Sequence, residues 1–217
     1  MKQSPVLIRG ELALLVIVVI NSLGVVLMLY SGSGISAISS VPYAFSEVLP
    51  ALSLGTWTYI FQGLLVLSLM LLRKRFVPQY LLSFVVGFAF GLMIDVHEIW
   101  ISELPQTLPL RVLYFVLSYL IICLGIALSN RCKMPIIPTD LFPREVSAIT
   151  GADYARVKIP FDVICLLITG IMTWVFLGEI RGLGIGTILA AFTMGKVIDF
   201  IGQGIDKHFV FTSVFEA

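Results

Sequence analysis

The chain has 217 residues, of which 59% are hydrophobic and only 12% are charged, and its formal net charge is +1. An average soluble domain carries about 25% charged residues, so this composition cannot cover a water-exposed surface and predicts an integral membrane protein. The near-zero charge and the lack of a basic stripe interleaved with aromatic residues argue against nucleic-acid binding.

Six segments are long and apolar enough to cross a bilayer, since a spanning helix needs roughly 20 mainly apolar residues. They lie at 12–30, 54–72, 80–101, 110–129, 159–177 and 183–201. The first could also be read as a signal peptide, but its apolar run is too long and no A-x-A-like cleavage site follows. We therefore expect an all-α membrane protein with six transmembrane helices, folded as one domain over residues 1–217.

Lysine and arginine set the expected orientation, because they collect in cytoplasmic loops. With six spans and an inside N-terminus, only Arg111 and Arg181 of the 14 basic residues fall outside. The cluster from Arg73 to Arg75 is the clearest stop after a span. Both termini are therefore expected in the cytoplasm. The three cysteines, Cys123, Cys132 and Cys165, would lie toward that side, and we interpret them as reduced thiols.

The loop after the first span is rich in Ser and Gly, yet it carries an apolar stripe. Ser39 or Ser40 can cap a short helix there, with Pro42 in its first turn and Tyr43 beside it. Such a segment either lies on the membrane interface or re-enters the bundle and lines a cavity.

The loop after the fourth span repeats this plan. Thr139 or Asp140 can cap a short helix, Pro143 comes early in it, and Gly151 is a stop. If these two loops are re-entrant, their N-terminal amides form ends that favour an anion. A plain interfacial helix is the alternative for both.

The two halves of the chain contain matching patterns about one hundred residues apart. The matches set Leu23-Gly24 against Leu124-Gly125, Pro42 against Pro138, Phe61-Gln62 against Phe161-Asp162, and GLMID (91–95) against GKVID (195–199). Each match is short, and apolar helices align easily by chance. Their common order predicts two three-helix repeats, 1–105 and 106–217. Because each repeat has an odd number of spans, the two would be inverted, as in many secondary transporters.

Carboxylates inside apolar segments are the main candidates for a site, since they are costly in a bilayer. Asp95 is expected near the outer end of the third span and Asp199 near the inner end of the sixth. Asp199 could instead pair with Lys196, one turn away, and Asp95 could belong to a solvated rim. Asp162 follows Pro160, where it could be a helix cap rather than a binding residue.

Other chemistry finds no support in the sequence. The histidines lack partners at metal-ligand spacing, and neither a G-x-S-x-G motif nor a Ser-His pair on adjacent turns is present. We expect no metal, no cofactor and no enzymatic activity. Small residues between Gly184 and Gly195 are typical of close helix packing rather than of a nucleotide site.

A set of short motifs resembles the YczE/YyaS/YitT-like group of bacterial integral membrane proteins. The motifs are Gly32-x-Gly34-x-Ser36-x-x-Ser39 with Pro42-Tyr43, Leu52-x-x-Gly55-x-Trp57-Thr58, Arg73 to Phe76, Phe90-Gly91-x-x-Ile94-Asp95, Pro138-x-Asp140 and Gly184 to Thr187. Pro42 and Tyr43 come one residue later than the strict spacing. The resemblance implies a multi-pass protein of the bacterial cytoplasmic membrane, described as transporter-like or as an accessory to secondary-metabolite production, and it names no substrate.

The first functional hypothesis is a small secondary transporter or permease with a site between the inverted halves. Its expected substrate-binding residues are Ser39, Pro42, Tyr43, Gln62, Asp95, Pro138, Asp140, Asp162 and Asp199. The alternative is a non-transporting accessory or importer-subunit protein that acts through the second loop on a partner. Expected partners are the lipid bilayer, a small molecule, and either a second copy or another protein.

Overall fold

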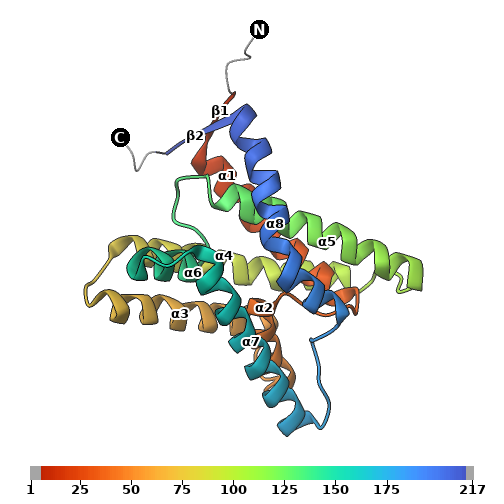
Figure 1. Cartoon of the computed structure of the whole chain (residues 1–217). Helices are drawn as coiled ribbons and strands as arrows, with labels where there is room; N and C mark the ends of the chain where they lie inside the picture. The colour runs from red at the N-terminus through yellow and green to blue at the C-terminus, as the bar shows by residue number, and fades with distance from the viewer. Residues whose placement is uncertain (1–5, 214–217) are drawn as a thin grey trace.

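The computed structural model describes residues 6–213, which form eight helices and two short strands (Figure 1). Six helices are long and apolar enough to cross a membrane, which confirms the all-α membrane class. The elements are β1 (Val6–Arg9), α1 (Gly10–Tyr30), α2 (Ala37–Val48), α3 (Leu54–Arg73), α4 (Pro78–Ile101), α5 (Leu108–Ser129), α6 (Pro138–Thr150), α7 (Tyr154–Leu177), α8 (Ile185–His208) and β2 (Phe209–Thr212).

The first four expected spans agree with α1, α3, α4 and α5 within two residues at each end. The expected start of the fifth span and the expected end of the sixth span were wrong. α7 begins at Tyr154, so Pro160 lies inside it, and α8 begins at Ile185 and continues to His208. The charged residues in its last turns are exposed at the helix end, where water can solvate them, so they do not terminate the helix.

A two-stranded parallel sheet joins the two ends of the described chain, a feature that the sequence patterns did not predict. Val6 pairs with Phe209 and Arg9 pairs with Thr212, with the pairs between them in register. The sheet holds the start of α1 beside the end of α8. Residues 1–5 and 214–217, the chain ends for which a cytoplasmic location is expected, lie outside the described residues.

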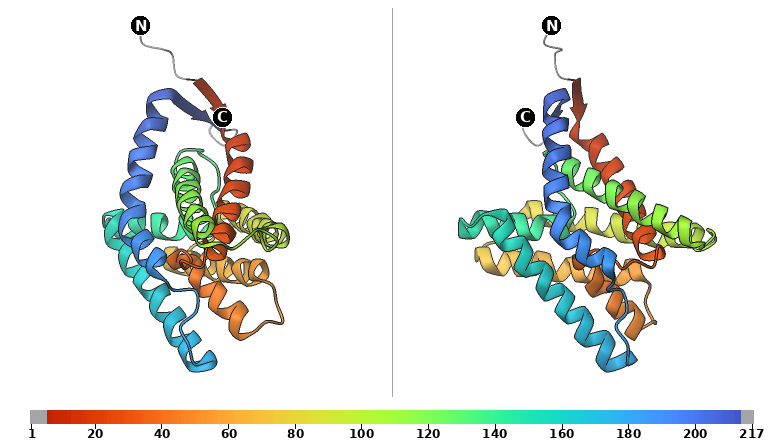
Figure 2. Two further views of the ribbon diagram at one scale, coloured as in Figure 1. Left: turned by 90° about the vertical axis from the view of Figure 1, so that its right-hand side faces the viewer. Right: turned by 45° about the vertical axis from the view of Figure 1, so that its right-hand side comes forward.

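The helices form two groups. In the first, α1 packs against α4 and α5, and α5 packs against α8. In the second, the short helices α2 and α6 each pack against both α3 and α7. The main contact between the groups is the packing of α3 on α4, which lie side by side in Figures 1 and 2.

Glycines allow α1 and α5 to cross closely. A Cβ atom added at Gly24 would lie 2.6 Å from Cγ1 of Ile122, and one added at Gly125 would overlap the side-chain oxygen of Asn21. The two contacts are equivalent, because Gly125 follows Gly24 by the same interval that separates Ile122 from Asn21. Each helix therefore presents its glycine to the same place on the other.

The helices α7 and α8 differ from α3 and α4, although they are expected to be their counterparts. They touch only sparsely, whereas α3 and α4 pack along their length. In the right-hand view of Figure 2, α8 rises toward the chain ends while α7 runs toward α3 and α6. The packing of α7 with α8 therefore differs from that of α3 with α4.

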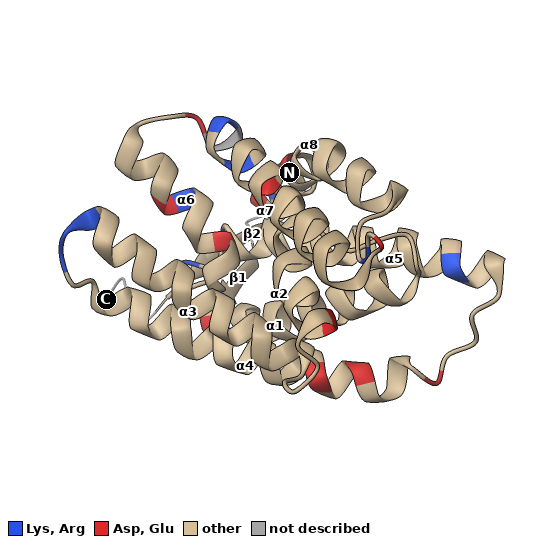
Figure 3. Cartoon of the chain, turned by 90° about the horizontal axis from the view of Figure 1, so that it is seen from below, with Lys and Arg blue, Asp and Glu red and all other residues tan. Residues whose placement is uncertain are grey.

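Two sides of the bundle can be defined from the loops. On the distal side, loops 31–36, 102–107 and 178–184 are joined by bonds such as Arg111 Nε to the Ser31 carbonyl at 2.9 Å and Ile35 N to the Gly182 carbonyl at 2.9 Å. On the terminal side lie the small sheet and Arg131, which holds Asp206 by two bonds of 2.6 and 2.7 Å. Figure 3 shows charged residues concentrated at loops and helix ends.

Candidate functional site

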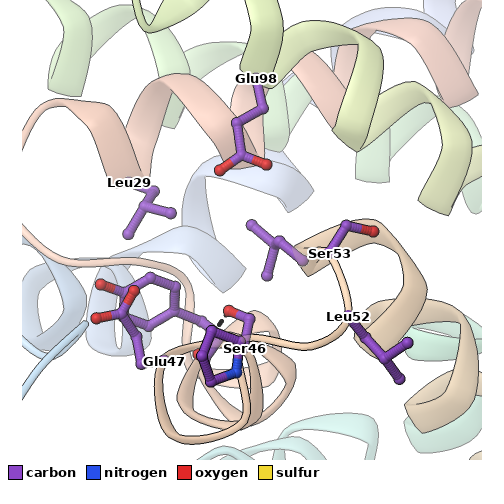
Figure 4. Close-up of a pocket in the computed structure, with 9 residues that line it drawn as sticks. Leu29, Ser46, Glu47, Leu52, Ser53 and Glu98 are labelled. Atoms are coloured by element: carbon purple, nitrogen blue, oxygen red, sulfur yellow. Dashed lines mark hydrogen bonds between the residues drawn. The ribbon is translucent and has the colours of Figure 1, made fainter.

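A pocket of about 210 Å³ opens on the distal side, between the end of α2, the start of α3 and the end of α4. Its lining combines apolar and polar side chains: Leu29, Tyr43, Ser46, Glu47, Pro50, Leu52, Ser53, Leu54 and Glu98. Figure 4 shows Glu98 pointing into it from one side, with Ser46 and Glu47 facing it from the other. A few polar groups within an otherwise apolar concave surface are typical of a small-molecule site.

The two carboxylates of the pocket differ in their partners. Glu47 accepts a hydrogen bond of 2.7 Å from Nη1 of Arg181, a residue of the loop between α7 and α8. Among residues 6–213, Glu98 has no ion pair or side-chain hydrogen bond. The pocket therefore holds one neutralised and one uncompensated acid, an arrangement that favours a cation.

Tyr43 closes one wall of the pocket. It lies on α2 with its ring against Gly182, where an added Cβ would overlap the ring. Burial, followed by the charge of Glu47, raises the pKa of Tyr43 to about 12. A hydrogen bond with Glu47 contributes to the same shift, so the Tyr43 hydroxyl lies beside that carboxylate at the wall of the pocket.

Asp95 lies just below the pocket and binds the start of α3. Its Oδ1 accepts the Gly55 N–H at 2.8 Å, and its Oδ2 accepts the Ser53 hydroxyl at 2.8 Å. The carboxylate thus satisfies an unpaired amide of the first turn and interacts favourably with the helix dipole. Asp95 lies within the last two turns of α4, and its observed contacts connect α4 with α3.

Two further predicted residues, Ser39 and Pro42, are in α2 but outside the pocket lining. The expected cap was wrong: α2 begins after Ser36, whose hydroxyl bonds that of Ser39 at 2.9 Å. Pro42 is buried as the sixth helical residue instead of lying in the first turn. Pro143 is likewise the sixth residue of α6, whereas Pro138, with which Pro42 was expected to match, is the first.

Gln62 lies at the contact of α3 with α4 and α6, with no exposed surface. A Cβ added at Gly87 would overlap its side-chain oxygen and lie 3.1 Å from Cδ of Pro138. Neither amide atom of Gln62 has a hydrogen-bond partner among the described residues. Pro138 is the first residue of α6 and Ile137 is its cap position, so the expected cap at Thr139 or Asp140 was wrong; the predicted stop at Gly151 is confirmed.

Asp162 and Asp140 belong to a second polar cluster near the terminal side. Both oxygens of Asp162 lie 2.6 Å from Nζ of Lys158, and the Asp162 side chain is 11% exposed. Asp162 is the ninth residue of α7, so its reading as a helix cap was wrong. Burial raises the pKa of Asp140 to about 6, although Lys158 and Arg144 partly oppose the shift.

Asp199 stands apart from both polar regions. It is exposed on α8, nine residues before the helix ends, so the expected position close to that end was wrong. No ion pair or hydrogen bond of its side chain, to Lys196 or to any other residue, occurs within residues 6–213. Of the predicted residues, the structure thus places Tyr43 in the lining of the distal pocket and Asp95 next to it through Ser53, and it leaves Asp199 apart.

Sequence reasoning missed the pocket residues Glu47, Glu98 and Ser53, and it missed Arg181, which pairs with Glu47. Glu98 could have been found from its spacing, since it is one turn after Asp95 on the same helix. The contact of Glu47 with Arg181 joins residues 134 positions apart, and no local pattern carries that information.

A family model described as a family of unknown function (DUF6198) matches residues 8–203, which include nearly all of the eight helices. The chain belongs to the DUF6198 family. No curated protein and no solved structure matches it. Membership in DUF6198 establishes kinship over the membrane domain and assigns no function.

Proposed function

We propose that this DUF6198 protein is a small secondary transporter built from two inverted three-helix repeats. The observation that carries the proposal is the reciprocal packing of Gly24 on Ile122 and of Gly125 on Asn21. Two segments related by a two-fold axis contact each other at equivalent positions in this way. Inverted repeats of this kind are the architecture of many secondary transporters.

The packing of the helices supports the same relation. If α1 to α4 correspond to α5 to α8, the contact of α1 with α4 corresponds to that of α5 with α8. Likewise, the contact of α2 with α7 corresponds to that of α6 with α3. The two prolines at the sixth positions of α2 and α6 fit this correspondence.

The distribution of charge supports an orientation in a bacterial cytoplasmic membrane, with the terminal side in the cytoplasm. Arg73 at the end of α3, Arg131 just after α5 and Lys158 near the start of α7 lie at helix ends opposite the distal loops. Arg111 and Arg181 belong to the distal side. Positively charged residues accumulate in cytoplasmic segments. The distal pocket would then open to the outside.

The pocket supports a small organic cation as the class of substrate. Glu98 offers an uncompensated carboxylate, while Ser46, Ser53 and Tyr43 offer hydroxyl groups around it. A volume of about 210 Å³ fits a molecule of only a few carbon atoms. Compact amines with one or two polar substituents match both properties.

Uptake into proteoliposomes that contain this protein alone tests the proposal. The probes are radiolabelled ethanolamine, choline and putrescine, each measured with and without a pH gradient and against empty liposomes. We expect saturable uptake of at least one probe, and we expect Glu98→Gln to reduce it. Glu103→Gln is the matched control, because Glu103 is exposed in the neighbouring loop and does not line the pocket.

The contrary result would be uptake equal to that of empty liposomes for every probe. In that case the alternative gains weight, namely a non-transporting accessory or importer-subunit protein that acts through a partner. Unchanged uptake by the Glu98→Gln variant would instead show that the distal pocket does not bind the transported probe.

A further inference from the structure

We infer that the protein carries two equivalent gates, closed at Asp95 and open at Asp199, and that α7 closes on α8 when α3 separates from α4. The inference rests on the proposed transport function and names the residues that would alternate. It arises from the difference between the extensive packing of α3 on α4 and the sparse contact of α7 with α8.

The closed gate is a close approach of two backbones fixed by a carboxylate. A Cβ added at Gly91 would lie 2.7 Å from the Gly55 carbonyl oxygen, and one added at Gly55 would overlap the Gly91 carbonyl. Asp95, one turn after Gly91, then reaches the Gly55 amide and the Ser53 hydroxyl. The Gly-x-x-x-Asp pattern is therefore a device for holding two helices together.

The same Gly-x-x-x-Asp pattern recurs on α8 as Gly195 and Asp199, but there no helix of the described chain packs against these two residues. Gly195 has nothing within 4 Å of an added Cβ, and Asp199 is exposed. The helices α8 and α4 turn the same side toward the core. Ile198, just before Asp199, packs on the core, and so does Ile94, just before Asp95. Asp199 consequently points to the side of α8 on which a closed α7 would lie.

The start of α7 contains charged groups suited to receive Asp199. Asp153 stands at the position that corresponds to Ser53, and Nε of Arg156 lies 3.3 Å from its carboxylate. On closure, Arg156 can bridge Asp153 and Asp199. Arg131, which forms an ion pair with Asp206, also interacts electrostatically with Asp199.

The packing explains why the two gates would move in opposite senses. Because α2 and α6 each contact both α3 and α7, these four helices can move as one body against α1, α4, α5 and α8. A rocking motion that brings α7 to α8 on the terminal side carries α3 away from α4 on the distal side. Rigid rocking of one bundle against another is the usual motion of inverted-repeat transporters.

A pair of cysteines at the open gate provides the test. In the closed gate, the Cβ of Tyr59 is 3.5 Å from an added Cβ at Gly91, which is within disulfide range of roughly 3.5–4.5 Å. The corresponding pair is Ile159→Cys with Gly195→Cys, both at exposed positions. It is introduced into a chain whose buried Cys123, Cys132 and Cys165 are replaced by Ala, in lipid nanodiscs.

We expect slow oxidative cross-linking in this background and roughly tenfold faster cross-linking when Asp95→Ala removes two hydrogen bonds from the closed gate. Ser53→Ala removes one of the two gate bonds, together with the bonds of Ser53 to Thr56, and should give a smaller acceleration. It provides a second test of the gate if the Asp95 variant misfolds. Asp199→Ala should slow the reaction. The control pair Ile159→Cys with Gly204→Cys uses another exposed glycine on α8 and should not respond to either change.

An unchanged rate in both Asp95→Ala and Ser53→Ala would overturn the inference, as would a control pair that responds equally. The outcome is independent of the uptake experiment. Cross-linking that responds as expected without uptake of any probe would contradict the proposed transport while leaving the paired gates intact.

Discussion

The carboxylate of Asp95 on α4 accepts the amide of Gly55 on α3 at 2.8 Å, and this contact joins the two groups of helices on the distal side. Gly55 is required because any side chain there would overlap the Gly91 carbonyl. The same carboxylate accepts the Ser53 hydroxyl, which in turn accepts the Thr56 amide at 3.1 Å. Asp95 therefore extends the cap of α3 from a different helix.

Replacing Asp95 should lower stability in proportion to the bonds that are lost. Asp95→Ala removes both acceptors, and we expect a loss of about 1.5–3 kcal/mol in the free energy of unfolding, typical of hydrogen bonds to a charged group. Asp95→Asn keeps one acceptor oxygen and should lose less. Thermal unfolding in detergent measures both, with Asp199→Ala as the matched control. Equal melting temperatures for the Asp95 and Asp199 variants would contradict the assigned contact.

The crossing of α1 and α5 makes a second prediction. Gly125→Ala forces a methyl group into the side chain of Asn21, and Gly24→Ala forces one toward Ile122. We expect each to destabilise the protein by about 1–3 kcal/mol, the usual effect of overpacking. Gly204→Ala is the control: its added Cβ meets nothing within 4 Å, so the helix should gain stability instead. Unfolding curves in which Gly24→Ala and Gly204→Ala coincide would show that the crossing is looser than described.

Periodicity and composition predicted much of this fold, because spanning helices have a strong local signature. The expected span 12–30 and the observed Gly10–Tyr30 differ by two residues at one end. The parallel pairing of Val6–Arg9 with Phe209–Thr212 could not be predicted, since it joins the two ends of the chain.

For the site, sequence reasoning selected residues that are costly in a bilayer, which is a local property. It found Asp95 because a carboxylate is costly in an apolar segment, and it found Tyr43 through the motifs of the family resemblance. It could not supply the contact of Glu47 with Arg181, because side chains far apart in sequence meet only through the packing of α2 against α7. It also assigned Asp162 to a helix start, because a proline two residues earlier usually indicates one.

The buried pair of Lys158 and Asp162 makes a third prediction. Asp162→Asn leaves the Lys158 ammonium in a site where it is 28% exposed, so we expect a loss of about 1–3 kcal/mol, less than for a fully buried pair. The double variant Lys158→Met/Asp162→Leu removes both charges and should recover most of that loss. Denaturant or thermal unfolding of the two variants distinguishes the cases. A neutral Asp162→Asn would indicate that Lys158 finds water or another partner.

The pH dependence of stability makes the last prediction, through Asp140 at the start of α6. Burial raises the pKa of Asp140 from its ordinary 3.8 to about 6, and Lys158 and Arg144 oppose that shift. The folded protein therefore binds this proton more tightly than the unfolded chain does. Between pH 3.8 and about 6 the folded state carries more protons, so the contribution of Asp140 to stability falls as the pH rises and is constant above that range.

Asp140→Asn cannot titrate, so its free energy of unfolding should lack this decline, and its advantage over the wild type should grow from pH 4 to pH 6. Unfolding in detergent at half-unit pH intervals measures the difference between the two curves. Asp153→Asn is the matched control at the exposed cap position of α7, and it should keep the wild-type slope because Asp140 is intact. A constant difference between wild type and Asp140→Asn across that range would mean that this carboxyl is solvated, and that the start of α6 is more open to water than its burial indicates.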